Sequence, residues 1–364
     1  MSMLGSFKEE FEKIEVEFDA QLQHMRRKSA SKSSTEIVIF GAGVVGHSVA
    51  MSMGDGINNL VAFCDNQKTG FNERFQIPII TPDQLINEHS DAQLIIACSA
   101  EYNDEIYNQV VKMGFDPERI SRYYSGYELY DIDHLKAHYE GYRWAYDFFN
   151  DDISKQIILD RIRNYLSYRK MEHSPAEDQY FDSDVIQLSE NEVFADGGFY
   201  IGDTSLEFIK RVNGCYDAIY GFEPDLTNLE AARANLAQHE RAHIIDKGLW
   251  DKDETLSFFP EGASSKVDRS GTVTISLTSL DEFFSDKKGL PTFIKLDVEG
   301  AEKRALMGAE KIIRVAHPKL AICVYHKPED IYELPQLIMQ FDPSYRFTLR
   351  HYTPGMWETV LYAI

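Results

Sequence analysis

Two acidic residues, each at the end of an apolar run, could bind a cationic nucleoside. Asp196 follows Phe194-Ala195 and precedes a glycine-rich segment that contains Gly198 and Gly202. A carboxylate can accept from an α-amino group, and glycines let a backbone approach a ligand closely. Glu223 ends the next apolar run, where a carboxylate can accept both hydroxyls of a ribose. The pattern predicts a site for a sulfonium nucleoside with an amino group, although both acids could instead cap helices.

A third group of charged residues interrupts an apolar run further along the chain. Lys295 and Asp297 alternate with apolar residues, and Glu299 follows two residues later. Alternation places Lys295 and Asp297 on one side of a strand, where a lysine and a carboxylate are costly unless they are paired or used. We expect Asp297 to face the site and Lys295 to pair with Asp297 or Glu299. A purely structural ion pair is the alternative.

His326 ends the next apolar run and should project from a neighbouring strand end. A histidine or a carboxylate at such a place can act as a general base, so His326 and Asp297 are the candidate bases. Asp297, Glu299 and His326 could instead hold a divalent ion that acidifies a bound hydroxyl. We favour the site without a metal.

The N-terminal half carries a second candidate site, in a glycine-rich loop. Gly41, Gly43 and Gly46 form a G-x-G-x-x-G pattern directly after the apolar run Ile37–Phe40. Such a loop before a helix suits a phosphate, because the backbone comes close and the first helical N–H groups are unpaired. Asp65 ends the next apolar run, at the position of a ribose-binding carboxylate. We predict a nucleotide or nucleotide-sugar here, and a vestigial structural loop is the alternative.

The elements that must position these residues form two β-α series. Short apolar runs in the first series alternate with helical segments, which predicts a parallel sheet covered on both faces. The second series begins at Phe194 and ends in two strand-like runs, separated by Thr353-Pro354-Gly355, that suggest an antiparallel pair. The expected fold is α/β, with two Rossmann-like doubly wound domains joined by a helical segment. The expected parts are a helix with a linker over 1–34, a nucleotide-binding domain over 35–128, a helical connector over 129–185 and a second domain over 186–364.

Composition narrows the classes of partner. The chain has 59 acidic and 37 basic residues among 364, for a net charge of −22, which argues against nucleic acid and anionic membranes as partners. No apolar run reaches the roughly 18 residues of a transmembrane helix. Four scattered cysteines suggest reduced thiols, so we expect a cytoplasmic protein. The apolar face of the helix expected over 5–27 docks on its own domain or forms a homodimer contact.

Six stretches of the second half together resemble the FkbM family of methyltransferases. The stretch TFIKLDVEGAEKRALMGAE is the most specific of them, and the others are VFADGGFYIGDTSLEF, YGFEPD, IIDKGLWDKDETLSFF, TSLDEFF and the LAICVYH segment. The resemblance implies a class I methyltransferase fold of seven strands, S-adenosylmethionine as donor and O-methylation of a hydroxyl. It also implies that Asp196, Gly198, Gly202 and Glu223 contact the donor. Asp246, or the backbone near Gly248, would then lie near the adenine.

The first half separately resembles the nucleotide-binding modules of sugar-modifying enzymes. This implies a glycan precursor or a related small molecule as acceptor. One rival function is an NAD-dependent sugar-nucleotide oxidoreductase that uses Gly41–Gly46. The absence of any Tyr-x-x-x-Lys pair and the complete second nucleotide fold weigh against it. Another rival is a non-catalytic scaffold that senses a nucleotide.

Overall fold

The computed structural model describes residues 4–31, 36–98, 100–124, 132–167, 171–258 and 273–364. The chain divides into two compact units. Unit 1 comprises Met1–Tyr139, Gln156–His173 and Thr353–Trp357, and unit 2 comprises Glu140–Lys155, Ser174–Tyr352 and Glu358–Ile364. The helical segment expected to connect two domains is therefore shared between the units.

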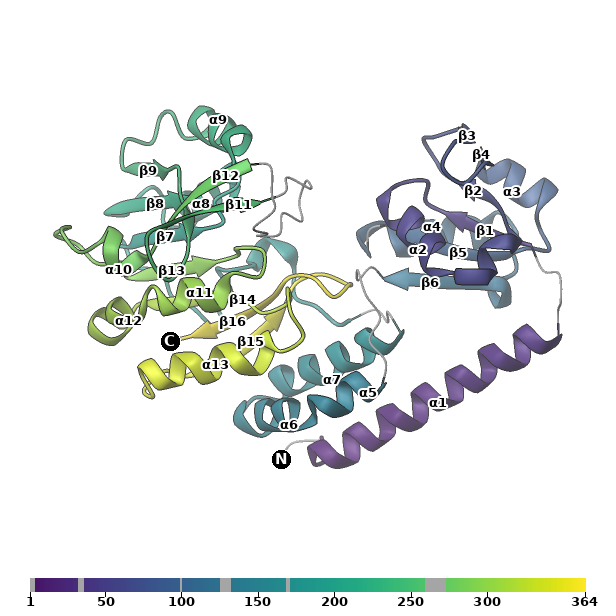
Figure 1. Ribbon diagram of the computed structural model, residues 1–364, viewed down its shortest axis with the longest axis horizontal. Coiled ribbons are helices and arrows are strands. Elements are labelled where there is room, and N and C mark those ends of the chain that lie inside the picture. Colours follow the sequence, from purple (N-terminus) through teal and green to yellow (C-terminus); the bar gives the residue numbers. More distant parts are fainter. Residues whose placement is uncertain (1–3, 32–35, 99, 125–131, 168–170, 259–272) are drawn as a thin grey trace. The chain divides into compact units, whose positions relative to one another are not determined.

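Unit 1 is built on a six-stranded sheet in the order β3-β4-β2-β1-β5-β6 (Figure 1). All its strand pairs are parallel except β3–β4. The strands are β1 (Ile37–Phe40), β2 (Leu60–Cys64), β3 (Gly70–Asn72), β4 (Ile77–Ile80), β5 (Gln93–Cys98) and β6 (Ile120–Tyr124). The helices are α2 (Val44–Ser52), α3 (Pro82–Glu88) and α4 (Ala100–Lys112), with 3₁₀ turns η1 (Gly54–Asn59) and η2 (Pro117–Arg119). Thr81 caps α3 in the reciprocal capping arrangement with Gln84, as Thr81-Pro82-Asp83 suggests.

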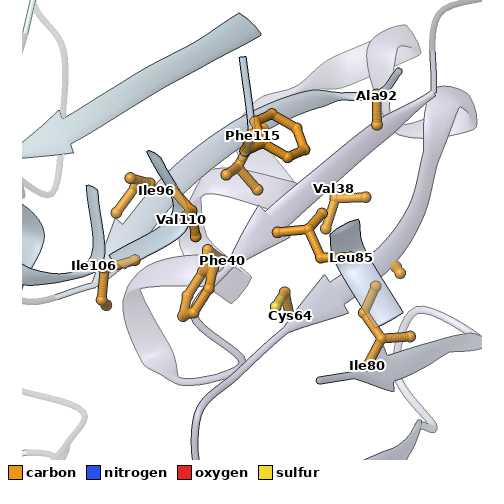
Figure 2. Close-up of a cluster of buried hydrophobic side chains, with 12 residues drawn as sticks. Val38, Phe40, Cys64, Ile80, Leu85, Ala92, Ile96, Ile106, Val110 and Phe115 are labelled. Atoms are coloured by element: carbon orange, nitrogen blue, oxygen red, sulfur yellow. The ribbon is translucent and has the colours of Figure 1, made fainter. Parts of the chain in front are cut away.

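Helices cover both faces of this sheet, because alternate strand residues point to opposite sides. Val38 and Phe40 pack on one side with Val110 of α4 and Leu85 of α3 (Figure 2). Ile39 packs on the other side, with residues of α2. The doubly wound architecture expected for the first half is confirmed.

The first helix, α1 (Phe7–Ser31), packs within unit 1. Phe7 and Phe11 are buried and lie 5.2 and 5.1 Å from Tyr139, ring centre to ring centre. Helix α1 continues to Ser31, beyond the helix expected over 5–27 and into the expected linker. The N-terminal half of its apolar face is thus covered by its own unit, and a homodimer contact stays a prediction.

Unit 2 is built on a seven-stranded sheet in the order β15-β16-β14-β13-β7-β8-β9 (Figure 1). Its strands are β7 (Val193–Gly197), β8 (Ala218–Phe222), β9 (Ala242–Ile245), β13 (Phe293–Leu296), β14 (Lys319–Cys323), β15 (Phe347–His351) and β16 (Thr359–Ala363). The first five are parallel, and β16 runs antiparallel to both β14 and β15. The expected seven-stranded class I methyltransferase sheet, with its closing antiparallel pair, is confirmed.

Helices and a small second sheet complete the chain. The helices are α5 (Ile132–Ala137), α6 (Tyr139–Phe148), α7 (Asp152–Ser167), α8 (Asp203–Arg211), α9 (Leu226–Asn235), α10 (Leu280–Phe283), α11 (Glu302–Met307), α12 (Glu310–Ala316) and α13 (Asp330–Phe341), with a 3₁₀ turn η3 (Ala176–Asp178). Three further strands, β10 (Gly248–Leu249), β11 (Glu254–Phe258) and β12 (Val273–Thr278), form a sheet that the sequence did not suggest. No helix in the described part of the chain has both the length and the apolarity needed to cross a bilayer.

Candidate active site

Four parallel strands of unit 2 end at the same edge of the sheet. Asp196 lies in β7, Glu223 follows β8, Asp297 follows β13 and His326 lies three residues beyond β14. Strand β7 is the point where the strand order reverses direction, with β8 on one side and β13 on the other. Ligands of open α/β sheets bind outside the carboxyl ends of the strands at such a switch point.

Asp196 and Lys295 form a buried ion pair beneath this edge. Lys295 Nζ lies 3.0 Å from Asp196 Oδ1, and both side chains are almost fully buried. Ser205 Oγ also donates to Asp196 at 2.8 Å. Burial raises the pKa of Asp196, while Lys295 and Ser205 oppose this rise. Burial alone would lower the pKa of Lys295, but Asp196 and Asp297 raise it. Lys295 is therefore a cation here.

The partner expected for Lys295 is wrong. Lys295 pairs with Asp196, not with Asp297 or Glu299, because β13 and β7 are paired with Lys295 directly opposite Asp196. Opposite residues on neighbouring strands have Cβ atoms about 4.5–5.5 Å apart, closer than residues two positions apart on one strand. Lys295 also donates to the carbonyl oxygen of Gly198 at 2.8 Å. The ion pair thus fixes the backbone of the glycine loop that follows β7.

The loop after β7 needs glycine at two of its positions. Gly198 has a φ of +74°, and a Cβ there would lie 1.7 Å from the carbonyl oxygen of Asp297. Gly202 has a φ of +79° and is the N-cap residue of α8. Both glycines therefore have a structural role, and their contact with a donor stays a prediction.

Glu223 lies against this loop. Its carboxylate accepts from the backbone N–H of Tyr200 at 2.8 Å and from that of Asp225 at 2.9 Å. Burial raises the pKa of Glu223, and these two N–H groups oppose the rise. Asp246 is exposed just beyond β9, the strand next to β8. Gly248 approaches Pro224, since a Cβ on Gly248 would lie 3.5 Å from Pro224 Cγ.

Asp297 is the centre of the second half of the site. Tyr180 Oη donates to one of its carboxylate oxygens at 2.8 Å, and Tyr325 Oη donates to the other at 3.0 Å. Burial favours the neutral acid, but Lys295, His326 and the two hydroxyls outweigh burial and lower the pKa of Asp297. Asp297 is therefore a fixed anion at the tip of β13.

His326 lies between carboxylates. Its Nε2 is 3.6 Å from Asp297 and 3.5 Å from Glu299, and its Nδ1 is 2.9 Å from Glu302. Burial would lower the pKa of His326, but the three carboxylates, led by Glu302, raise it to about 9. Burial and neighbouring carboxylates raise the pKa of Glu299 to about 7, against the attraction of His326. Neighbouring side chains of the site thus have pKa values of about 7, for Glu299, and about 9, for His326.

The structure brings in residues that the sequence alone did not single out, among them Tyr180, Glu302 and Glu358. Glu358, just before β16, accepts from Gln179 Nε2, and burial together with Asp297 raises its pKa to about 7. Glu302 had a sequence signal, because it lies in the same acidic stretch as Glu299. Tyr180 had none, since it precedes the second β-α series. Glu358 had none because it lies at the beginning of a strand, which reaches this edge of the sheet only because β16 is antiparallel.

Backbone strain is concentrated around these residues. Seven non-glycine residues of the described chain have a positive φ. Four of them lie at the site, namely Tyr180 at +66°, Tyr200 at +51°, Glu299 at +53° and Glu358 at +63°. Such conformations cost of order 1–3 kcal/mol each and gather at functional sites. The clustering is independent evidence that this edge is functional.

Two groups of side chains here could hold a metal ion. One comprises Asp297, Glu302 and His326, and the other comprises Asp297, Cys323 and Glu358. Within each group the potential ligand atoms lie within 4.8 Å of one another. A divalent ion therefore stays an alternative to a metal-free site.

The glycine loop of unit 1 joins β1 to α2, as expected. A Cβ on Gly41 would lie 2.1 Å from the carbonyl oxygen of Ala97, and one on Gly46 would lie 1.8 Å from that of Gly41. These two glycines are needed for packing. A Cβ on Gly43 would meet no atom within 4 Å, so packing does not explain this glycine.

Asp65 holds the same loop. It accepts from the backbone N–H of Ala42 at 2.9 Å, and from the N–H groups of Gln67 and Lys68. Burial would raise its pKa, but these N–H groups and the Lys68 ammonium lower it. Asp65 is therefore an anion committed to its own backbone, and its contact with a ribose stays a prediction.

Comparison with known proteins agrees with this geometry. The family model of the methyltransferase FkbM domain matches residues 196–349. A crystal structure of a methyltransferase FkbM from Methylobacillus flagellatus KT superposes with a TM-score of 0.71 at 20% identity, covering 98% of this chain and 99% of that one. At that identity the match establishes the shared fold. No curated protein sequence matches the chain.

A second structure matches only part of the chain. It is the fibrillarin of Aeropyrum pernix with bound S-adenosyl-L-methionine, at 12% identity, 50% coverage of this chain and 70% of that one. Its TM-score of 0.34 is too low to support an argument about this chain. The family model and the confirmed seven-stranded sheet carry the assignment. Residues 196–349, less than half of the chain, match the methyltransferase FkbM domain and lie in a unit with the class I methyltransferase sheet.

Proposed function

We propose that this chain is an S-adenosylmethionine-dependent methyltransferase. It transfers the methyl group of the donor to a hydroxyl of a sugar, a glycan precursor or a related small molecule. The observation that carries the proposal is the cluster of Asp297, Glu299 and His326 beside the loop that ends at Gly202. A sugar hydroxyl is a weak nucleophile, so its methylation needs a base near the point of attack. The cluster offers such a base, and the acidic surface of the chain argues against nucleic acid as the acceptor.

The residues at the strand tips fit the methyl donor. Glu223 has a carboxylate at the tip of β8 that can accept from both ribose hydroxyls, and exposed Asp246 at the next tip can reach an adenine. The donor, when bound, supplies an electrophilic methyl group on a positively charged sulfur. Asp196 has no exposed surface, so we propose that it acts through Lys295 and the Gly198 carbonyl, which set the shape of the loop.

The chain's own residues then have three tasks. Glu223 and the loop orient the donor, and alignment of the reacting atoms can lower the barrier by roughly 7–11 kcal/mol. Asp297, fixed by Tyr180 and Tyr325, presents a negative charge beside the site. His326 or Asp297 removes the hydroxyl proton. We propose the cytoplasm as the compartment, since all four cysteines are free thiols.

The test is methyl transfer from S-adenosylmethionine labelled in its methyl group. Nucleotide-sugars, free sugars and polyols are offered as hydroxyl acceptors, with amino sugars and sugar acids as matched amine and carboxylate acceptors. We expect label in a base-stable methyl ether of a hydroxyl acceptor. Label found only in methylamines or in base-labile methyl esters would contradict O-methylation.

We propose further that unit 1 binds a nucleotide or a nucleotide-sugar at Gly41–Gly46. Gly43 carries this proposal, because an absent side chain there serves no packing and leaves the backbone open to a phosphate. The loop also precedes the N-terminus of α2, which has no side-chain cap. NAD-dependent oxidation of a sugar-nucleotide and nucleotide sensing are the alternative roles of this domain.

Alanine substitutions separate the two roles of these glycines. We expect Gly43→Ala to fold normally, because its Cβ enters open space, but to lose binding of the phosphate. We expect Gly46→Ala to destabilise unit 1, since its Cβ would clash with the backbone of Gly41. Thermal unfolding with UDP-glucose, UDP and NAD reports both effects, because a ligand that binds the folded state raises the unfolding temperature. Equal stabilisation of wild type and Gly43→Ala by the same nucleotide would contradict the site.

A further inference from the structure

Glu302, the first residue of α11, is a buried carboxylate in a fixed position. Its side chain is fully buried, and its Oε1 accepts from the backbone N–H groups of Val298 at 2.9 Å and Gly300 at 3.4 Å. The same oxygen forms an ion-pair contact with Nδ1 of His326 at 2.9 Å, although the contact does not have the geometry of a hydrogen bond. A carboxylate is costly to bury unless it is paired and hydrogen-bonded. The backbone of the loop between β13 and α11 therefore fixes Oε1 of Glu302 beside the imidazole of His326.

The other side of the imidazole faces the site. Nε2 of His326 is 3.5 Å from Glu299 and 3.6 Å from Asp297, so it is not committed to a short hydrogen bond with either carboxylate. The ring packs beside that of Tyr325, with 4.2 Å between their centres. Glu299 is half exposed, which makes this side the approach to Nε2. The two nitrogens of His326 thus have different surroundings.

A carboxylate at Nδ1 determines the tautomer of a neutral histidine. Ionised Glu302 places a negative charge 2.9 Å from Nδ1, which favours a hydrogen there over a lone pair. The neutral ring then carries its hydrogen on Nδ1 and its lone pair on Nε2. We propose that Glu302 is the positioning residue that fixes His326 as this tautomer and so makes Nε2 the base for the acceptor hydroxyl. This inference rests on the proposed function, because it assigns the base of that reaction.

The proton and electron pairs balance in this step. Nε2 takes the proton of the acceptor hydroxyl, and the electron pair of its O–H bond becomes available on oxygen. An oxygen electron pair forms the new O–CH₃ bond as the S–CH₃ bond breaks, and that pair stays on sulfur. Glu302 stabilises the imidazolium that results, until the proton leaves to solvent.

Several charged groups surround the pair and contribute to its titration. The acids that interact with His326 or Glu302 are Asp297, Glu299, Asp330 and Glu358. Lys295 and the hydroxyls of Tyr180 and Tyr325 act on Asp297, and Lys327 acts on Asp330 and the Gly300 carbonyl. Among the causes that raise the pKa of His326, the contact with Glu302 is the largest, and burial opposes it. Removing the charge of Glu302 should therefore lower that pKa.

A metal ion shared by Asp297, Glu302 and His326 is the competing use of these side chains. The ring presents Nδ1 to Glu302 and Nε2 to Asp297, on opposite sides. One ligand atom from each of the three side chains nevertheless lies within 4.8 Å of the others, close enough for a shared ion. Titration of the protein with Mn²⁺ therefore has to distinguish the relay from a shared ion.

The tautomer can be measured without any acceptor. In protein carrying ¹⁵N-labelled histidine, His326 is identified among the 11 histidines as the signal lost in His326→Gln. We expect it to titrate near pH 9 in the wild type and to be the Nδ1–H tautomer above that pH. An Nε2–H tautomer in the wild type would overturn the inference, whether or not any variant folds.

The isosteric variant Glu302→Gln tests the charge. We expect the Nδ1–H tautomer to persist, because the amide oxygen still accepts, while the acid dissociation constant of His326 rises at least tenfold. Glu333→Gln, which removes an exposed carboxylate paired with Lys303, is the matched control and should leave His326 unchanged. An unshifted titration in folded Glu302→Gln would overturn the inference. So would saturable broadening of His326 by Mn²⁺ that Glu302→Gln abolishes, because it would show a metal site.

Turnover supplies the second readout, with the hydroxyl acceptor identified by the labelled-methyl assay. We expect the rising limb of kcat/KM against pH to move to lower pH in Glu302→Gln and its plateau to fall. A loss of activity at every pH without movement of the limb would mean a merely structural role. If methyl transfer occurs but the rising limb does not move in Glu302→Gln, the role of Glu302 is wrong and the proposed function is unaffected. If His326 is the Nδ1–H tautomer but no hydroxyl is methylated, the proposed function is wrong and the role of Glu302 in fixing the tautomer is unaffected.

Discussion

Replacing Lys295 with methionine is expected to lower the free energy of unfolding of unit 2 by about 3–5 kcal/mol, the usual cost of removing one partner of a buried ion pair. The carboxylate of Asp196 has no exposed surface and would be left with Ser205 as its remaining side-chain partner. The Gly198 carbonyl would lose its lysine donor at the same time. Urea unfolding followed by circular dichroism measures the loss.

The controls for Lys295→Met isolate the ion pair. Lys303→Met removes an exposed lysine paired with Glu333 and should cost no more than about 1 kcal/mol. Adding Asp196→Asn to Lys295→Met should recover part of the stability, because no charge then stays buried. The difference in free energy of unfolding between the wild type and Lys295→Met should also become smaller as pH falls. Protonation of Asp196 removes the buried charge that destabilises the folded variant. If Lys295→Met lowers the free energy of unfolding no more than Lys303→Met does, the buried ion pair between Lys295 and Asp196 is contradicted.

Replacing His326 with alanine is expected to slow methyl transfer by roughly 10²–10⁴-fold, the usual contribution of a general base. Affinity for the donor should stay close to that of the wild type, because His326 lies at the tip of β14 and Glu223 at that of β8. The wild-type rate should rise with pH, since a pKa of about 9 keeps His326 protonated at neutral pH. Bound S-adenosylmethionine adds a positive charge near His326, which should lower the pKa of His326 and move the rise in rate to lower pH.

The pH profile of His326→Ala identifies any replacement base. If Glu299 takes over, the residual activity should titrate above pH 7, because the variant lacks the imidazole that lowers the pKa of Glu299 in the wild type. His239→Ala is the matched control, because His239 precedes β9 at the opposite edge of the sheet. Wild-type rates and an unchanged pH profile in His326→Ala would exclude His326 as the base.

The parts of the fold that are local in sequence could be predicted. Apolar runs with acids or glycines at their ends located the strands that precede both glycine loops, and Thr353-Pro354-Gly355 located the turn of the last pair. The resemblance to a family supplied the strand count. The segment from 171 to 186 was expected to be largely helical, but outside η3 it contains no helix. It carries Tyr180, whose hydroxyl binds Asp297, and no local pattern signals such a role.

The parts of the site that depend on register could not be predicted. The partner of Lys295 follows from the alignment of β13 with β7, which alternation within one strand does not reveal. The contact of Glu358 with Gln179 joins two segments that are 179 residues apart in sequence. The raised pKa values of Glu299 and Glu358 depend on burial among other acids, which appears only once the chain is folded.

The central claim is that Glu223 holds the ribose of S-adenosylmethionine at the tip of β8. Calorimetric titration of wild type, Glu223→Ala and the exposed helix variant Glu230→Ala with this donor tests the claim most directly. Two hydrogen bonds to a charged group, each contributing about 1.5–3 kcal/mol, predict that Glu223→Ala weakens binding by at least 100-fold. Glu230→Ala should bind as the wild type does. Equal affinity of all three proteins would contradict the account.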